Sequence, residues 1–194
     1  MGFVANADGT FYASGHPGRG VGLPDPLGLI ASTDGGANWT PVWRQGESDF
    51  HALATTAEGI VGFDGELRTS ADGREWATVT DGPAPYALAG NPQHQVVLAT
   101  TEAGLWRSED GGATWKAPAD GPVLITAAFV DARTVVGVSP AGGVYASVDV
   151  GRSWKSVGKT SGQPAAITGT RTDDGRATIW VVGVDGGTQR LEIP

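Results

Sequence analysis

The sequence has 194 residues, enough for one domain or several small repeats but too few for two large domains. It carries 13 Lys and Arg against 21 Asp and Glu, and this formal charge of −8 argues against a nucleic acid or an anionic membrane surface as partner. No cysteine is present, which excludes disulfides and thiolate metal sites, and no apolar run reaches the roughly 18 residues of a membrane span.

A short motif recurs along the chain at a constant spacing. The form S-x-D-x-G-x-x-W occurs three times, and a version one residue shorter occurs once. Its aspartates are 38, 38 and 39 residues apart, and a period of this length is typical of repeat architectures. The repeated positions are Ser32, Asp34, Gly36 and Trp39; Ser70, Asp72 and Trp76; Ser108, Asp110, Gly112 and Trp115; and Ser147, Asp149, Gly151 and Trp154.

Each motif is surrounded by short β-rich runs that Gly, Asp and Pro separate. These runs predict strands, and the absence of any 3.6-residue apolar period predicts that helices are nearly absent. In chain order the predicted strands are 11–14, 27–31 and 38–42; 49–56, 59–63, 67–70 and 75–79; 86–89, 95–100, 105–108 and 114–117; and 123–130, 134–138, 144–147 and 153–157. A hairpin turn is predicted at 173–176.

About 38 residues in four strands are typical of one blade of a β-propeller. The predicted fold class is therefore all-β, with a single β-propeller domain over residues 1–194. Its blades are expected at about 1–44, 45–82, 83–120 and 121–160, followed by three strands of a partial fifth blade at 161–194. The blades either close a five-bladed ring or form an open arc of a larger ring.

The motif itself has a structural interpretation. Glycine permits a positive φ at the tip of a turn, and the aspartate accepts hydrogen bonds from backbone N–H groups across it. The tryptophan begins the fourth strand of its blade, where its ring is expected to be buried between blades. We expect the irregular motif at Trp76 to contribute less stability than the regular one at Trp115.

At these residues the sequence resembles the Asp-box (BNR-repeat) β-propellers, which include sialidases, other glycoside hydrolases, sortilin-type receptors and a photosystem assembly factor. A closer likeness is to the bacterial F510_1955-type glycosyl hydrolases, and it is carried by the segments 1–3, 13–17, 27–30 and 49–53. In such relatives a further blade and an export signal precede the Met-Gly-Phe segment. Neither is found here, so the resemblance implies an open arc, and it suggests a secreted or cell-envelope location for complete relatives.

The order of strands in a blade predicts where a ligand would bind. The loop entering the first strand and the loop between the second and third strands open on one face, whereas the motif turns lie on the opposite face. The candidate ligand-binding residues on the first face are His16, Arg19, Asp49, His51 and Tyr86. Their ligand would be a glycan, a small molecule or a protein.

Three of these residues also form a candidate metal site. His16, Asp49 and His51 carry side chains that suit Zn²⁺, although no short motif fixes their geometry. Alternatively, His51 caps a strand and the carboxylates are solvated loop charges. No cofactor is predicted.

A glycosidase would need two carboxyl groups roughly 5–5.5 Å apart for retention, or 6.5–9.5 Å apart for inversion. The candidate catalytic carboxylates are Glu47, Asp49, Asp64 and Glu66, and Tyr86 is the candidate nucleophile of a sialidase-like reaction. The arginine context that the resemblance demands of a sialidase is missing. We therefore predict a non-catalytic binding or scaffold propeller, with a glycoside hydrolase of exo-glycosidase or sialidase-like type as the alternative.

Overall fold

The computed structural model describes residues 2–117, 120–172 and 175–193. Every regular element in this part of the chain is a β-strand, and the strands form five antiparallel sheets in chain order. The first sheet contains β1 (Phe3–Ala5), β2 (Phe11–Ala13), β3 (Leu29–Ser32) and β4 (Thr40–Trp43). The second contains β5 (Ala52–Thr56), β6 (Gly59–Phe63), β7 (Leu67–Ser70) and β8 (Ala77–Thr78).

The remaining three sheets repeat this order of strands. The third sheet contains β9 (Ala87–Gly90), β10 (Val97–Thr101) and β11 (Gly104–Ser108). The fourth contains β12 (Thr126–Phe129), β13 (Val135–Val138), β14 (Gly143–Ser147) and β15 (Lys155–Lys159). The last contains β16 (Pro164–Arg171), β17 (Ala177–Gly183) and β18 (Thr188–Ile193).

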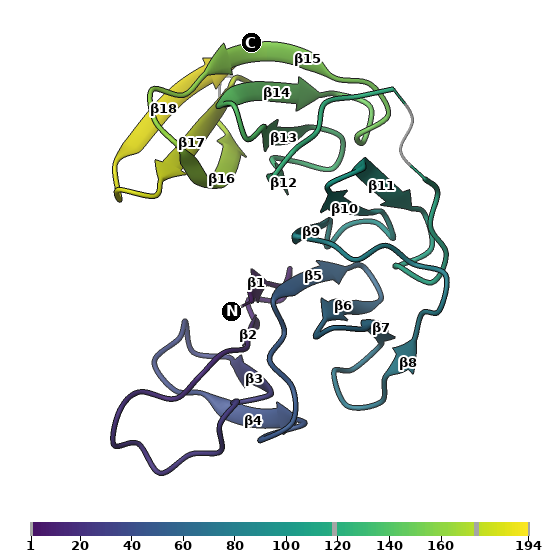
Figure 1. The fold of residues 1–194 in the computed structure, drawn as a ribbon, viewed down its shortest axis with the longest axis vertical. Helices are drawn as coiled ribbons and strands as arrows, with labels where there is room; N and C mark the ends of the chain where they lie inside the picture. The colour runs from purple at the N-terminus through teal and green to yellow at the C-terminus, as the bar shows by residue number, and fades with distance from the viewer. Residues whose placement is uncertain (1, 118–119, 173–174, 194) are drawn as a thin grey trace.

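The sheets stand side by side around a common centre, with the first strand of each sheet innermost (Figure 1). The inner strands β1, β5, β9, β12 and β16 contact one another in that order. This arrangement is that of β-propeller blades, as predicted. Within the described residues the first and last sheets are not packed together, so the blades form an open arc and the closed five-bladed ring is wrong.

The core lies between consecutive sheets rather than inside any one of them. Four clusters of buried apolar side chains fill the four sheet-to-sheet contacts. The contact between the second and third sheets, for example, buries Val61 and Val97 completely. Each sheet therefore depends on its neighbours for most of its apolar burial.

The four motifs form turns with the same hydrogen bonds, and we call them the Ser-Asp turns (residues 32–39, 70–76, 108–115 and 147–154). In the third turn the Ser108 hydroxyl donates to Asp110 and accepts from the Gly112 N–H, both at 2.8 Å. The Asp110 carboxylate also accepts from the Thr114 N–H, and the Trp115 indole N–H donates to the Gly112 carbonyl. The shorter second turn keeps the equivalent bonds through Gly73.

The tryptophans of the turns pack against the preceding sheet. Trp76, Trp115 and Trp154 each join the cluster that their sheet shares with the sheet before it. The expectation of a buried ring is wrong for Trp39, which is 36% exposed because no sheet in the described chain lies on that side of the first sheet. Its indole N–H still donates to the Gly36 carbonyl.

The sequence prediction missed one strand and predicted another that is not formed. The innermost strand of the first sheet, β1, was not predicted, because three residues between glycine and asparagine give too short an apolar pattern. The predicted strand at 114–117 is reduced to one bridge between Arg107 and Lys116, since Ala117 precedes a proline that has no N–H for a ladder. The predicted turn at 173–176 includes Asp173 and Asp174, which lie outside the described residues.

Candidate functional site

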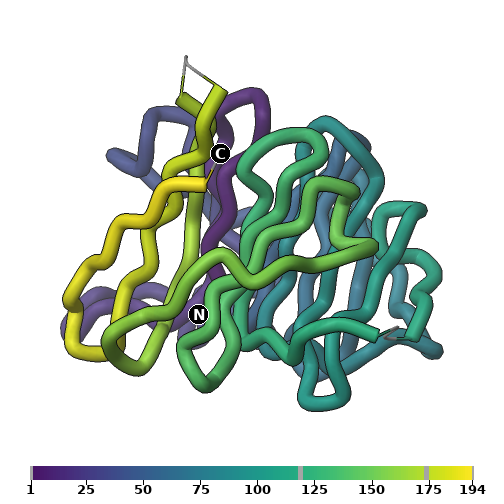
Figure 2. Tube along the Cα trace, turned by 90° about the horizontal axis from the view of Figure 1, so that it is seen from above, coloured from purple at the N-terminus to yellow at the C-terminus, as the bar shows by residue number. Residues whose placement is uncertain are grey.

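The antiparallel order of strands creates two loop faces, which Figure 2 shows at the two ends of the strands. The connections from β2 to β3 and from β4 to β5 open on one face, which we call the rim face. The Ser-Asp turns and the connections between first and second strands open on the opposite face, which we call the turn face.

On the rim face, two histidines and two carboxylates lie together. His16, in the loop from β2 to β3, places Nδ1 2.5 Å from Asp25 Oδ1 and Nε2 3.3 Å from Asp49 Oδ2. The Nδ1 atom of His51 lies 3.7 Å from the same Asp49 oxygen. The structure thus brings two predicted residues, His16 and His51, to the carboxylate of a third, Asp49. We call His16, Asp25, Asp49 and His51 the His-Asp cluster.

Local packing holds Asp49 and His51 in place. Between them, Phe50 is fully buried and packs with the first two sheets, and its N–H donates to the Ser14 hydroxyl at 2.9 Å. The His51 N–H donates to the Phe63 carbonyl, which begins the pairing with β6. One apolar side chain therefore fixes the polar residues on either side of it.

Protonation of His16 is favoured by its partners. The hydrogen bond to Asp25, with the charges of Asp25 and Asp49, raises the pKa of His16 above its ordinary value. The rings of His16 and His51 are 58% and 62% exposed, so both remain accessible to a ligand.

Asp49 has a feature of its own in this cluster. Its side chain is only 17% exposed, and its Oδ1 atom is buried without a hydrogen-bond partner. It is the only such side-chain atom found in the described part of the chain. A buried carboxylate oxygen without a donor is costly, and because this atom is closed to solvent, a ligand or water can donate an N–H or O–H group to it only if neighbouring side chains move.

The other candidate carboxylates are engaged by arginines. Arg68 pairs with both Asp64, at 3.1 Å, and Glu66, while Arg44 lies 3.7 Å from Glu47. Ser48, next to Asp49 in the chain, accepts from Arg44 and donates to Asp64, both at 2.6 Å, and so bridges these two residues. Sequence reasoning missed the bridging role of Ser48, although its position beside Asp49 was a signal.

The environment of Asp64 keeps it ionised. Burial raises the pKa of Asp64, but hydrogen bonds from Ser48 and Arg68 outweigh it and hold the pKa below its ordinary value. A general acid of a glycosidase needs the opposite shift. Asp64 is therefore suited to holding the rim together rather than to donating a proton.

Two predicted residues are not joined to this site. Tyr86 lies just before β9 with 60% of its surface exposed, and its N–H pairs with the Thr100 carbonyl. Among the described residues, no hydrogen bond or ion pair connects the side chain of Tyr86 or Arg19 to the His-Asp cluster. The predicted site thus comes together only in part.

A metal site would need several ligating side chains around one point. Across residues 2–117, 120–172 and 175–193, no group of three or more His, Asp and Glu side chains is arranged to hold a metal ion. The candidate metal site at His16, Asp49 and His51 is therefore not supported, although His16 lies 3.3 Å and His51 3.7 Å from Asp49 Oδ2. No helix in the same residues is long and apolar enough to cross a membrane.

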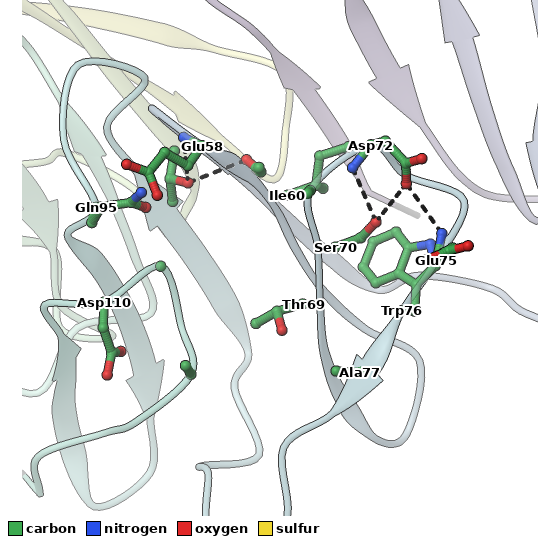
Figure 3. Close-up of a pocket in the computed structure, with 15 residues that line it drawn as sticks. Glu58, Ile60, Thr69, Ser70, Asp72, Glu75, Trp76, Ala77, Gln95 and Asp110 are labelled. Carbon is green, nitrogen blue, oxygen red and sulfur yellow. Dashed lines mark hydrogen bonds between the residues drawn. The ribbon is translucent and has the colours of Figure 1, made fainter.

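A groove of about 620 Å³ lies on the turn face, between the second and third sheets (Figure 3). Glu58 and Gln95 line it from the connections between first and second strands, and the second Ser-Asp turn contributes Glu75 and Trp76. Asp72 and Asp110 also line it, but their carboxylates accept the hydrogen bonds of their own turns. Sequence reasoning placed the ligand on the other face and did not predict this groove.

The fold and the two loop faces define the protein as a β-propeller. No protein-family model matches the sequence, and no curated protein matches it either. Among solved structures, the GH74 enzyme of Niastella koreensis superposes with a TM-score of 0.70 and 18% identity, over 99% of this chain and 29% of that one.

Two further structures give a similar result. YCF48 bound to D1 peptide matches 97% of this chain and 64% of its own, with a TM-score of 0.52 and 18% identity. The GH74 xyloglucanase of Xanthomonas campestris matches 93% and 30%, with a TM-score of 0.56 and 19% identity. The chain spans less than two thirds of each of these chains. At such identities the likeness shows the propeller fold alone.

Proposed function

We propose that this chain is a non-catalytic binding or scaffold propeller of the Asp-box (BNR-repeat) group, and that its ligand lies on the rim face at the His-Asp cluster. The observation that carries the proposal is the buried, unpartnered Oδ1 atom of Asp49 beside two exposed imidazoles. Membership of the Asp-box group is supported by the repeated hydrogen bonds of the four Ser-Asp turns.

The cluster selects a ligand by its hydrogen-bond donors. The Asp49 carboxylate only accepts hydrogen bonds, so the ligand must bring an N–H or O–H group, as a peptide or a sugar does. The exposed imidazole of His51 offers a donor or an acceptor beside it, whereas both ring nitrogens of His16 already face the carboxylates of Asp25 and Asp49. A structural neighbour, YCF48, has been solved with a bound peptide, which supports a peptide as the ligand here.

A glycoside hydrolase is the second candidate, and the GH74 enzymes among the structural neighbours favour it. The carboxylates on the rim face argue against a glycoside hydrolase. Glu47, Asp64 and Glu66 are each paired with an arginine, and the lowered pKa of Asp64 opposes proton donation. A binding role requires none of these carboxylates to change its protonation state.

Binding and catalysis can be separated by two assays on the purified chain. A random peptide library displayed on phage and a glycan array serve as binding probes, and chromogenic glycosides with xyloglucan serve as substrates. We expect a selected probe to lose roughly tenfold or more in affinity when Asp49→Ala or Asp49→Asn is introduced. Glu58→Ala, which removes an exposed carboxylate on the turn face, is the matched control and should bind as the parent does.

Two results would overturn the proposal. One is release of reducing sugar from xyloglucan or of chromophore from a glycoside that is lost in Asp64→Asn, since this would establish a hydrolase. The other is a probe whose affinity is unchanged in Asp49→Ala and Asp49→Asn while thermal melts show that both variants are folded.

A further inference from the structure

The second, third and fourth Ser-Asp turns each contact an apolar side chain of the sheet before them. A methyl group added to Gly112 would lie 2.9 Å from Val61 of the second sheet, and one added to Gly151 would lie 2.9 Å from Leu98 of the third. Val61 and Leu98 both belong to the second strand of their sheet. In the third and fourth turns the glycine and the tryptophan three positions later thus form a socket for the second strand of the preceding sheet, whereas Gly73 of the second turn meets Leu29 of β3.

In the first sheet, no side chain from another sheet of the described chain occupies the same socket. A methyl group on Gly36 would approach only Phe11 and Trp39 of its own sheet, at 3.8 Å, and Trp39 is 36% exposed. The strand register places Phe3 beside Ala13 and Ile30 on this face of the sheet. Phe3 is 61% exposed and its ring meets that of Phe11 at 5.4 Å.

The last sheet presents the complementary face. Ile167, Ile179 and Val181 point toward the fourth sheet and are buried against it. Their neighbours alternate to the opposite face, where the register pairs Ala166 with Val182 and Thr168 with Trp180. Trp180 and Val182 lie in the second strand, β17, and are only half-buried.

We propose that the last sheet of one copy of this chain packs on the first sheet of a second copy, with Trp180 and Val182 entering the socket formed by Gly36 and Trp39. The contact continues the interface that already joins each pair of consecutive sheets. It uses two different surfaces, so it is a heterologous contact and leaves one free face of each kind on the pair for a further contact. Exposed apolar faces of this kind are typical of protein–protein interfaces.

Sedimentation equilibrium of the purified chain tests the proposal. Phe3→Glu places a charge on the first face and Ala166→Glu places one on the last face, and both positions are exposed. We expect the parent to associate, and each variant to do so roughly tenfold more weakly or worse. Val148→Glu is the matched control, because Val148 is 65% exposed but lies in the fourth Ser-Asp turn, and it should associate as the parent does.

Mixing the two variants distinguishes this contact from other modes of association. A Phe3→Glu copy keeps an intact last sheet and an Ala166→Glu copy keeps an intact first sheet, so an equimolar mixture should regain a dimer. Because the chain has no cysteine, Ala5→Cys and Thr168→Cys copies can be joined by a bis-maleimide, and a mixed product is expected. A parent that is monomeric at all concentrations, a mixture that stays monomeric, or Ala5→Cys copies that join mainly to each other would overturn the proposal.

Discussion

The four turn tryptophans occupy equivalent positions in the sequence but not equivalent surroundings. Trp115 packs into the cluster between the second and third sheets, whereas Trp39 is 36% exposed on the uncovered face of the first. Both make the same indole hydrogen bond to a turn carbonyl. The pair therefore separates the contribution of packing from that of the hydrogen bond.

Replacing Trp115 by alanine is expected to lower the free energy of unfolding by about 3 kcal/mol, because a large ring leaves a cavity between two sheets. Trp39→Ala is the matched control and should cost clearly less. Urea denaturation of the two variants and the parent is the measurement. Equal losses would show that the hydrogen bond, rather than packing between sheets, sets the value of these tryptophans.

The surroundings of Trp76 argue against the expectation that its irregular turn makes it contribute less stability than Trp115. The Trp76 ring stacks on those of Trp43 and Phe50, at 5.2 Å from each. The missing residue shortens the turn but leaves the hydrogen bonds through Gly73 in place. We therefore expect Trp76→Ala to be at least as destabilising as Trp115→Ala, with the same denaturation experiment as the check.

The turn aspartates make stability depend on pH. Hydrogen bonds from the backbone and side chain of Asn38 lower the pKa of Asp34 to about 2, and similar bonds lower the pKa of Asp72, Asp110 and Asp149. Since these pKa values lie below the unfolded value of about 4, the stabilisation is complete above pH 4 and is lost as pH falls toward 2.

The urea midpoint of the parent is accordingly expected to drop between pH 4 and pH 2. A variant carrying Asp34→Asn should lose less stability over the same range, because it has one fewer group to protonate. An identical slope in both proteins would contradict the assigned hydrogen bonds.

At the scale of elements, the loop from β2 to β3 is tied to the entry of β5 through His16. Asp25 and Asp49 raise the pKa of His16, so the contact contributes its full stabilisation below the unfolded pKa of about 6.5 and loses it as pH rises through the folded value. We expect the NMR titration of His16 to have its midpoint above 6.5. In Asp25→Asn the midpoint should fall, and a midpoint that does not move would place the cause elsewhere.

Strand positions were predicted well where turns frame them and poorly where they do not. The predicted strands at 59–63 and 67–70 coincide with β6 and β7, because glycine and aspartate mark both ends. The strand β1 was missed, because its three residues pair with β2 through tertiary position rather than through a pattern of their own. Local propensity is too weak to locate such a strand.

The candidate site was predicted to a similar extent. Chain order alone placed His16, Asp49 and His51 on one face, because connections of the same kind open on the same side of every sheet. Chain order did not predict which carboxylates would pair with arginines, since the positions of Arg44 and Arg68 depend on side-chain packing. The groove at Glu58 was missed for the same reason, because it is a space between sheets and not a motif.

At the scale of the whole molecule, the arc has central sheets with two neighbours and end sheets with one. Most apolar burial is shared between sheets, so stability should fall from the centre toward both ends. Hydrogen exchange followed by mass spectrometry is expected to show roughly tenfold slower exchange in β9 and β10 than in β1 and β17. Uniform protection along the chain would mean that the five sheets open only together.

Each sheet is also one continuous stretch of chain, and this has a mechanical consequence. If the molecule were held by its two ends and stretched, an end sheet would detach without disturbing the sheets beyond its neighbour. Each detachment would release about 38 residues, or roughly 130 Å of extended chain at about 3.4 Å per residue. The force would then rise and fall in a regular saw-tooth, so the spacing of the aspartates in the sequence would reappear as the spacing between rupture events.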